Sequence, residues 1–170
     1  MKKTGIIVAM KEELDEILKI MTNINKKEIY NIQYFEGCIN QTDIIIVESG
    51  VGKVNATRTT QILIDKLDVK EIINVGSAGA LNEELSIGDI VIADKLIQHD
   101  FDITAFNHNK GYITGVGDYI YTDKELIDKF RNSANKIEDK SYKINVGTIA
   151  SGDIFCTDIK MKDLTASTIF

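Results

Sequence analysis

The chain has 170 residues, 44% of them apolar and 27% charged, and this composition is typical of a globular domain that buries a core of its own. Its formal net charge of −6 argues against nucleic acid or a membrane surface as a partner, because both attract basic patches. No apolar run is long enough for a membrane span or a signal peptide. Cys38 and Cys156 lie far apart with no CxxC spacing, so we expect reduced thiols in a cytoplasmic protein.

Short apolar runs alternate with helical periodicity along the chain. The runs are expected to form buried strands at residues 6–9, 32–39, 43–47, 72–75, 90–93 and 144–150. Apolar residues at i, i+3, i+4 and i+7 predict amphipathic helices at residues 14–21, 53–67 and 123–138. The glycine-broken stretch 112–121 is expected to be loop. Strands that alternate with helices predict an α/β fold with a mostly parallel central sheet.

The two longer expected helices have apolar faces that should point to the core. In the helix over 53–67 this face consists of Val54, Ile62, Leu63 and Leu67, with the small Ala56 beside them. In the helix over 123–138 it consists of Leu126, Ile127, Phe130, Ala134 and Ile137.

Three turns of small residues follow the ends of expected strands: "ESGVGK", "VGSAGA" and "ASGD". In α/β folds, ligands bind at the carboxyl ends of the strands, where small side chains would let a ligand approach main-chain N–H groups. Tight packing alone would also explain each turn. The first turn is not a P-loop, because Val54 stands where Ser or Thr should follow the lysine. It is not a dinucleotide fingerprint either, because Asn55 replaces the third glycine.

Two short motifs have polar side chains in suggestive places. Glu12 and Glu13 open a helix just past the first strand. They either complement the helix dipole, or one of them enters the strand-end cleft as a general base. The segment "HDFD", residues 99–102, has metal-like spacing, but His108 is the only other histidine. We therefore expect a hydrogen-bonding role there and no metal site. The segment "SGDIF" is either a polar turn or a device that places Phe155 over a flat ligand.

The order of six segments is more specific than any one of them. "GIIVAMKEEL", "SGVGKVNA", "INVGSAGAL", "GDIVIAD", "QHDFDITAF" and "ASGDIF" follow one another along the chain. Over residues 4–160 this arrangement resembles the 5'-methylthioadenosine/S-adenosylhomocysteine nucleosidases of the purine nucleoside phosphorylase superfamily. The resemblance implies a three-layer sandwich with a mostly parallel or mixed central sheet. It also implies a homodimer that uses water to cleave methylthioadenosine or adenosylhomocysteine into adenine and a thio-sugar, without metal or cofactor.

The resemblance also implies the roles of particular residues. Glu13 would activate the attacking water. Phe155 would stack on adenine, and the backbone of Cys156 would hydrogen-bond the edge of the base. Met10 would line the ribose and thio side, and Phe106 would reach into the thioalkyl pocket of the partner subunit.

The remaining residues that the resemblance assigns to the site belong to the first two glycine turns. Val51 would lie near the attacking water. The turn that approaches the nucleoside would consist of Ser77, Ala78 and Gly79.

A purine nucleoside phosphorylase is the nearest alternative enzyme. Such enzymes resemble this chain in fold but typically carry an arginine just before the glycine turn, where Asn74 stands here. The only arginines are Arg58 and Arg131, and neither is in a glycine turn. Arginine is the side chain best suited to hold a phosphate dianion, so water is the expected nucleophile.

The resemblance stops before the last motifs of the family. Family members continue past residue 170 with a Met-Glu-x-Glu motif that binds ribose and a Ser-Asp whose aspartate protonates purine N7. Residues 164–170 do not resemble that continuation. We expect a single domain over residues 1–170 that lacks the C-terminal strand and helices, and a reduced or absent activity because a general acid is missing. The alternatives are a non-catalytic adenine-nucleoside-binding remnant and a second polypeptide that completes the enzyme.

Overall fold

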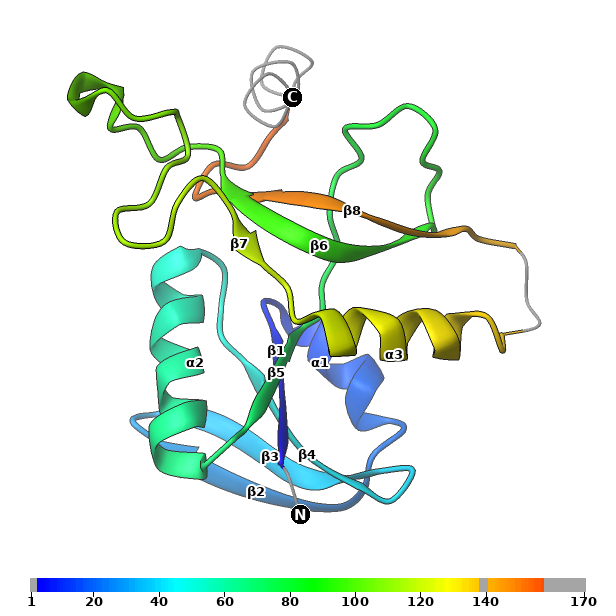
Figure 1. Ribbon diagram of the computed structural model, residues 1–170. Coiled ribbons are helices and arrows are strands. Elements are labelled where there is room, and N and C mark those ends of the chain that lie inside the picture. Colours follow the sequence, from blue (N-terminus) through cyan, green and yellow to red (C-terminus); the bar gives the residue numbers. More distant parts are fainter. Residues whose placement is uncertain (1–2, 138–140, 158–170) are drawn as a thin grey trace. The chain divides into compact units, whose positions relative to one another are not determined.

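The computed structural model describes residues 3–137 and 141–157. The chain divides into two compact units, Met1–Ala78 and Gly79–Phe170 (Figure 1). The single domain expected over residues 1–170 stays a prediction, and the unusual segment 164–170 lies outside the described residues. Within the described part of the chain, no helix has the length and apolarity needed to span a membrane.

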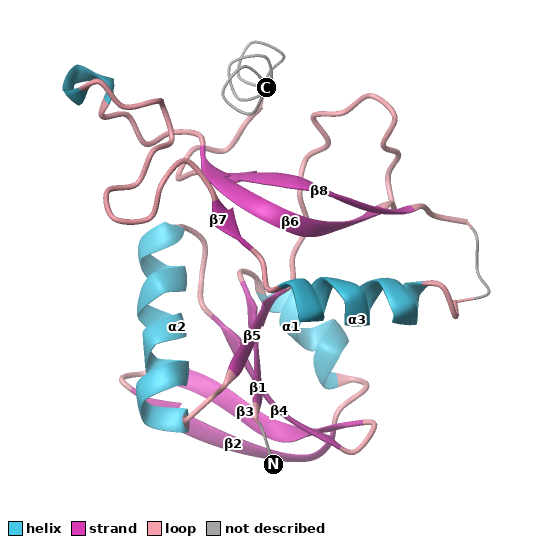
Figure 2. Ribbon diagram, in the orientation of Figure 1, coloured by secondary structure: helices cyan, strands magenta, loops and turns pink. Residues whose placement is uncertain are grey.

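The first unit contains five strands and two helices. They are β1 (Thr4–Val8), α1 (Lys11–Leu18), β2 (Thr22–Ile29), β3 (Ile32–Ile39), β4 (Thr42–Glu48), α2 (Lys53–Leu67) and β5 (Glu71–Asn74). The strands form one mixed sheet in the order β2-β3-β4-β1-β5 (Figure 2). β1 lies between β4 and β5 and runs parallel to both, while β2, β3 and β4 pair as antiparallel neighbours.

The two helices of this unit cover opposite faces of its sheet. Successive residues of a strand point to opposite faces, and the two buried clusters follow that alternation. Ile7 packs in one cluster with Leu63 of α2, whereas Ile6 packs in the other with Leu14 of α1. This unit is therefore a three-layer α/β/α sandwich, as the sequence led us to expect.

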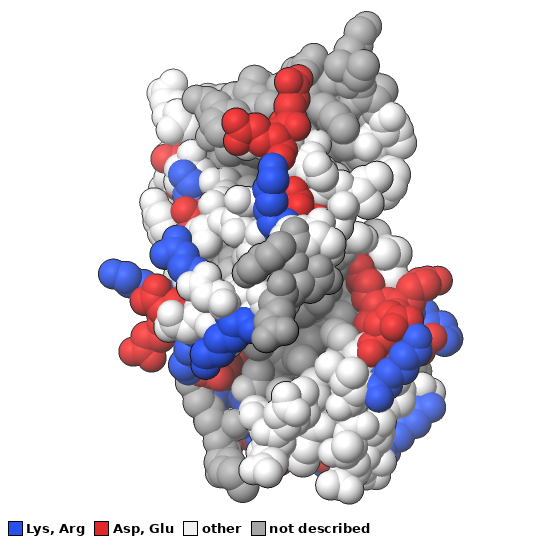
Figure 3. Space-filling model, turned by 90° about the vertical axis from the view of Figure 1, so that its right-hand side faces the viewer, with Lys and Arg blue, Asp and Glu red and all other residues white. Residues whose placement is uncertain are grey.

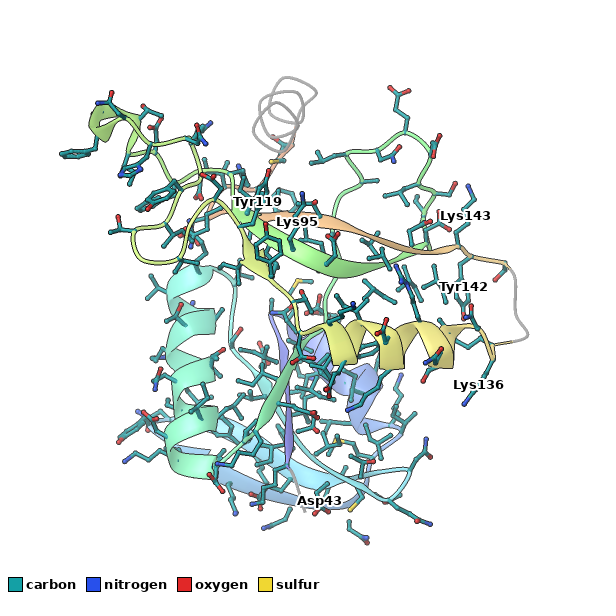
Figure 4. The ribbon with its side chains drawn as sticks, viewed as in Figure 1. Asp43, Lys95, Tyr119, Lys136, Tyr142 and Lys143 are labelled. Carbon is teal, nitrogen blue, oxygen red and sulfur yellow. The ribbon has the colours of Figure 1, made fainter. Side chains whose placement is uncertain are left out.

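The second unit contains three strands and one α-helix. They are β6 (Ile90–Gln98), the short 3-10 helix η1 (Thr104–Phe106), β7 (Ile120–Tyr121), α3 (Lys124–Ala134) and β8 (Ile144–Ser151). The sheet has the order β7-β6-β8, with β6 parallel to β8 and antiparallel to β7. Beside this sheet, Lys95 of β6 places its Nζ 4.3 Å from the ring centre of Tyr119 (Figure 4), a cation–π contact.

Most of the expected elements are present with shifted ends. α2 has the predicted bounds, but the helix expected at residues 14–21 is α1, which ends at Leu18. The strand expected at 90–93 continues to Gln98 as β6, and the expected loop at 112–121 ends in the short strand β7. The helix expected at 123–138 ends at Ala134 as α3.

Several expectations from apolar patterning differ from the structure. β2 was not expected, because its sequence TNINKKEI has no apolar alternation and nearly every residue is exposed. Val54 was expected to be buried, yet it is 79% exposed. It lies in the first turn of α2, next to the ends of the strands, where the sheet supplies few side chains to cover it. Phe130 of α3 is likewise 41% exposed, and Ile137, three residues past the end of α3, is 39% exposed.

Charged side chains of both signs share the surface. On the face drawn in Figure 3, acidic and basic side chains lie interspersed. On α1, Lys11 pairs with Asp15 at 2.5 Å and Lys19 pairs with Glu16 at 2.5 Å. Exposed pairs of this kind add little stability, so the fold of the first unit depends mainly on its two buried clusters.

Candidate active site

Three parallel strands of the first unit end side by side at one edge of its sheet. These strands are β4, β1 and β5. The Ser49 N–H donates to the Val8 carbonyl at 2.8 Å, and the Val75 N–H donates to the Ile7 carbonyl at 3.0 Å. The chain leaves β1 for α1 on one face, and it passes from β4 through α2 to β5 on the other. Such a reversal is a topological switch point, where α/β sheets bind ligands.

Glu13 connects two of the turns at this edge. It is the third residue of α1 and directs its carboxylate back toward the end of β1. Its Oε2 accepts hydrogen bonds from the N–H groups of Ala9 at 2.9 Å and Met10 at 3.1 Å. Its Oε1 accepts from the Ser77 N–H at 3.0 Å, with the Ser77 hydroxyl at 3.5 Å. One half-buried carboxylate therefore ties the turn after β1 to the turn after β5.

The two carboxylate oxygens of Glu13 differ in their remaining hydrogen-bonding capacity. Each oxygen can accept about two hydrogen bonds. Oε2 already accepts two from the main chain. Oε1 accepts one of ordinary length, and its hydroxyl contact at 3.5 Å is too long to be strong. Oε1 can therefore accept a hydrogen bond from a further donor, such as a water molecule.

Gly76 lies directly against this oxygen. A Cβ on Gly76 would sit 3.2 Å from Glu13 Oε1, so any larger residue would force the carboxylate to move. The absence of a side chain at Gly76 therefore allows Glu13 to reach the Ser77 N–H.

The turn after β4 has a backbone that requires glycine at two positions. Gly50 has φ +81° and Gly52 has φ +101°, values that L side chains rarely adopt. Val51 stands between them and is 71% exposed. The Asn55 side-chain amide donates to the Val51 carbonyl at 2.8 Å, which fixes this turn against the start of α2.

The structure brings together part of the expected site within the first unit. The Glu13 carboxylate accepts hydrogen bonds from the main-chain N–H groups of Met10 and Ser77. Met10 is 38% exposed. Val51 and Ala78 belong to the turns at the same edge. Gly79 begins the second unit.

The second unit carries the two aromatic residues of the expected site. Phe155 is 87% exposed and follows the end of β8, and Cys156 beside it is half-buried. Phe106 is 75% exposed in η1. The Asp102 carboxylate accepts from the Thr104 N–H at 2.9 Å and the Thr104 hydroxyl at 2.8 Å. The backbone hydrogen bond from Thr104, followed by its hydroxyl, lowers the pKa of Asp102 from its usual value.

The segment of residues 99–102 has the hydrogen-bonding role that was expected of it. Asp100 Oδ2 accepts from the Asp153 N–H at 2.8 Å, and the Asp102 carboxylate accepts from the N–H and the hydroxyl of Thr104. Among the described residues, no group of three or more His, Cys, Asp or Glu side chains is arranged to hold a metal ion.

Known proteins are similar to this chain in sequence and in fold. The sequence model of the Phosphorylase superfamily matches residues 3–168. The 5'-methylthioadenosine/S-adenosylhomocysteine nucleosidase of Staphylococcus haemolyticus is 37% identical over 158 residues, which span 93% of this chain and 68% of that protein. The chain belongs to the 5'-methylthioadenosine/S-adenosylhomocysteine nucleosidases.

Solved structures of this nucleosidase family have the same fold. The Streptococcus pyogenes S-adenosylhomocysteine nucleosidase, in complex with 5-methylthiotubericidin, is 35% identical with a TM-score of 0.92 over 98% of this chain and 70% of its own. The nucleosidase of Colwellia psychrerythraea, in complex with adenine, is 30% identical with a TM-score of 0.94 over 98% of this chain and 69% of its own. The predicted family and the mixed α/β fold are confirmed, while the expected incompleteness at the C-terminus stays a prediction.

Sequence reasoning missed the contacts of three residues near the candidate site. The Ser49 N–H donates to the Val8 carbonyl at 2.8 Å and joins two strand ends, while its hydroxyl lies 2.8 Å from the Gly50 carbonyl. Gly76 leaves room for Glu13, and Asp100 holds the turn before Phe155. Their positions within small-residue turns gave a signal, but only the contacts assign them these roles.

Proposed function

We propose that this chain hydrolyses the N-glycosidic bond of 5'-methylthioadenosine and S-adenosylhomocysteine, and that it releases adenine and the corresponding thio-ribose. Its membership of the nucleosidase family supports this reaction. The observation that carries it is the Glu13 carboxylate, which three main-chain N–H groups hold at the strand-end edge with Oε1 still able to accept a proton. The proposed reaction requires no cofactor.

Glu13 acts as the general base in this reaction. A water molecule donates one proton to Oε1 while its oxygen forms a bond to C1' of the ribose. The bond from C1' to N9 breaks, and its electron pair leaves with adenine, which takes up a proton from an acid or from solvent. Three hydrogen bonds from two turns fix the carboxylate before substrate arrives, and such positioning is a large part of enzymatic rate enhancement.

The nucleoside lies against the small-residue turns. Met10, Val51, Ser77, Ala78 and Gly79 contact the ribose side and the attacking water. Support comes from the exposure of Met10 and Val51 and from the Ser77 N–H that already bonds Glu13.

The base and the thioalkyl group are recognised by residues of the second unit. Phe155 stacks on adenine, and the main chain of Cys156 bonds the edge of the base. Phe106 contacts the thioalkyl group bound by a second copy of the chain, which makes the active form a homodimer. The large exposed fractions of Phe155 and Phe106 leave their rings available for such contacts. A cytoplasmic location accords with these substrates.

Water serves as the nucleophile in place of phosphate. Asn74 is the last residue of β5, directly before the glycine turn. Arg58 lies in α2 and Arg131 in α3 of the second unit, and neither belongs to a glycine turn. The carboxylate of Glu13 would also repel a phosphate dianion, so this edge favours an uncharged nucleophile.

The experiment is a measurement of binding and of adenine release. The full chain is mixed with methylthioadenosine, binding is followed by calorimetry, and free adenine is measured with and without phosphate. Glu13→Gln removes the base and keeps the shape. Glu12→Gln is the matched control, because Glu12 is an exposed neighbour in the same helical turn.

Each outcome of this experiment has a defined meaning. We expect phosphate-independent release that Glu13→Gln lowers by at least about a hundredfold and that Glu12→Gln leaves nearly unchanged. Binding without release would overturn hydrolysis and favour the adenine-nucleoside-binding remnant. Release only with phosphate would identify a phosphorylase, and a failure to bind would reject the proposed function.

A further inference from the structure

Two carboxylates hold the β6–β8 strand pair of the second unit at its two ends. Asp89 immediately precedes β6, and its Oδ1 accepts from the N–H of Lys143, which immediately precedes β8 (Figure 4), at 2.7 Å. Asp100 follows β6 by two residues, and its Oδ2 accepts from the N–H of Asp153, which follows β8 by two residues, at 2.8 Å. The two strands are parallel, so each carboxylate fixes one end of the same pair.

The end held by Asp100 fits unusually closely. The His99 N–H donates to the Ser151 carbonyl at 3.1 Å and extends the strand pairing by one step. A Cβ on Gly152 would overlap His99 Nε2 and would lie 2.9 Å from His99 Cε1 and 3.0 Å from Asp100 Cγ. The main chain of residues 151–153 is therefore pressed against the side chains of His99 and Asp100.

Phe155 and Cys156 follow this turn directly along the chain. Only Ile154 separates Asp153 from Phe155, and Phe155 itself is 87% exposed, so its own packing does little to fix it. The position of its ring therefore depends on where the preceding turn is held. Hydrogen bonds to a carboxylate are about twice as strong as neutral ones, which suits Asp100 to this task.

We propose that Asp100 is a positioning residue for purine recognition, because it fixes the turn of residues 151–153 and thereby sets Phe155 and Cys156 at the base. This inference rests on the proposed function, since that function assigns the purine to Phe155 and Cys156. Asp100 does not itself touch the substrate.

The chain supplies a matched control for this proposal. Asp89→Ala and Asp100→Ala each remove a carboxylate that accepts a main-chain N–H beside the same strand pair. Only Asp100 is at the end that leads to Phe155. Asp100→Asn keeps the shape and one oxygen that can accept the Asp153 N–H, so it serves as the conservative variant.

Two measurements on the full chain test the proposal. Amide hydrogen exchange by NMR reports the Asp153 and Lys143 N–H groups without any ligand. Calorimetry with adenine reports affinity at a temperature where circular dichroism shows every variant folded. We expect Asp100→Ala to speed exchange at Asp153 and to weaken adenine binding by about tenfold or more. Asp89→Ala should speed exchange at Lys143 and leave adenine affinity close to that of the unaltered chain. Asp100→Asn should recover most of the affinity.

The opposite results would overturn the proposal. Unchanged adenine affinity in Asp100→Ala, with protection at Asp153 lost, would show that the turn does not set the purine site. Equal losses of affinity in Asp89→Ala and Asp100→Ala would show a general effect of stability. If the unaltered chain fails to bind adenine, both the proposed function and this inference fail. If only the inference fails, the unaltered chain still binds adenine normally.

Discussion

Glu13 caps its own helix and also reaches a second turn of the sheet. One oxygen bonds the N–H groups at the start of its own helix, as a capping glutamate does. The other oxygen accepts from the N–H of Ser77, which is 64 positions away from Glu13 in the chain. The capping bonds orient the side chain, and this orientation leaves Oε1 at the end of the sheet where β4, β1 and β5 finish. A helix-capping role and a catalytic role are therefore compatible in this residue.

Gly76→Ala tests how closely the position of this carboxylate is set. The new Cβ would lie 3.2 Å from Glu13 Oε1 and would push the carboxylate away from Ser77. We expect the rate constant of adenine release to fall by about tenfold to a hundredfold, because small displacements of catalytic groups are costly. Gly147→Ala is the control, since its Cβ would meet only Val91 at an ordinary 3.9 Å. An unchanged rate in Gly76→Ala would contradict this account of the glycine.

At the scale of single elements, β2 shows what apolar patterning cannot detect. It is an edge strand with the sequence TNINKKEI and is exposed along almost its whole length. It pairs with β3 through a tight turn in which Tyr30 and Asn31 have φ of 54° and 61°. Such left-handed pairs are typical of two-residue hairpins. The lysines of an edge strand also discourage further pairing with other chains.

The burial of α2 gives a prediction for the stability of the first unit. Leu63 is fully buried at 0% exposure, whereas its neighbour Ile64 is 45% exposed. We expect Leu63→Ala to lower the free energy of unfolding by about 2–5 kcal/mol and Ile64→Ala to lower it much less. Urea unfolding followed by circular dichroism measures both. Similar losses in the two variants would mean that α2 does not pack on the sheet through the face that contains Leu63.

At the scale of the whole molecule, the residues of the expected site are divided between two compact units. Glu13, Met10, Val51, Ser77 and Ala78 belong to the first unit, and the remainder belong to the second. In each unit, some of these residues lie on a turn that follows a parallel strand, such as Ser77 after β5 and Phe155 after β8. The same structural device, a small-residue turn fixed by a carboxylate, appears in both: Glu13 in the first unit and Asp100 in the second.

The proposed homodimer gives a prediction at this scale. Light scattering after gel filtration should give twice the mass of the chain. Phe106→Ala should raise the KM for methylthioadenosine and leave adenine affinity unchanged, because Phe106 would contact only the thioalkyl group. A monomer that still hydrolyses methylthioadenosine normally would contradict the role proposed for Phe106.

The sequence by itself determined the family, the alternation of strands and helices, and the bounds of α2. Local periodicity and the order of six short motifs carry that information, because both can be read along the chain without knowing which distant segments meet. The exposure of Val54, the existence of β2 and the contacts of Gly76 and Asp100 were decided only by the tertiary structure. Each of these depends on a contact or an exposure that arises when distant segments pack. A hydrogen bond such as that from the Asp153 N–H to Asp100 leaves no periodic trace in the chain.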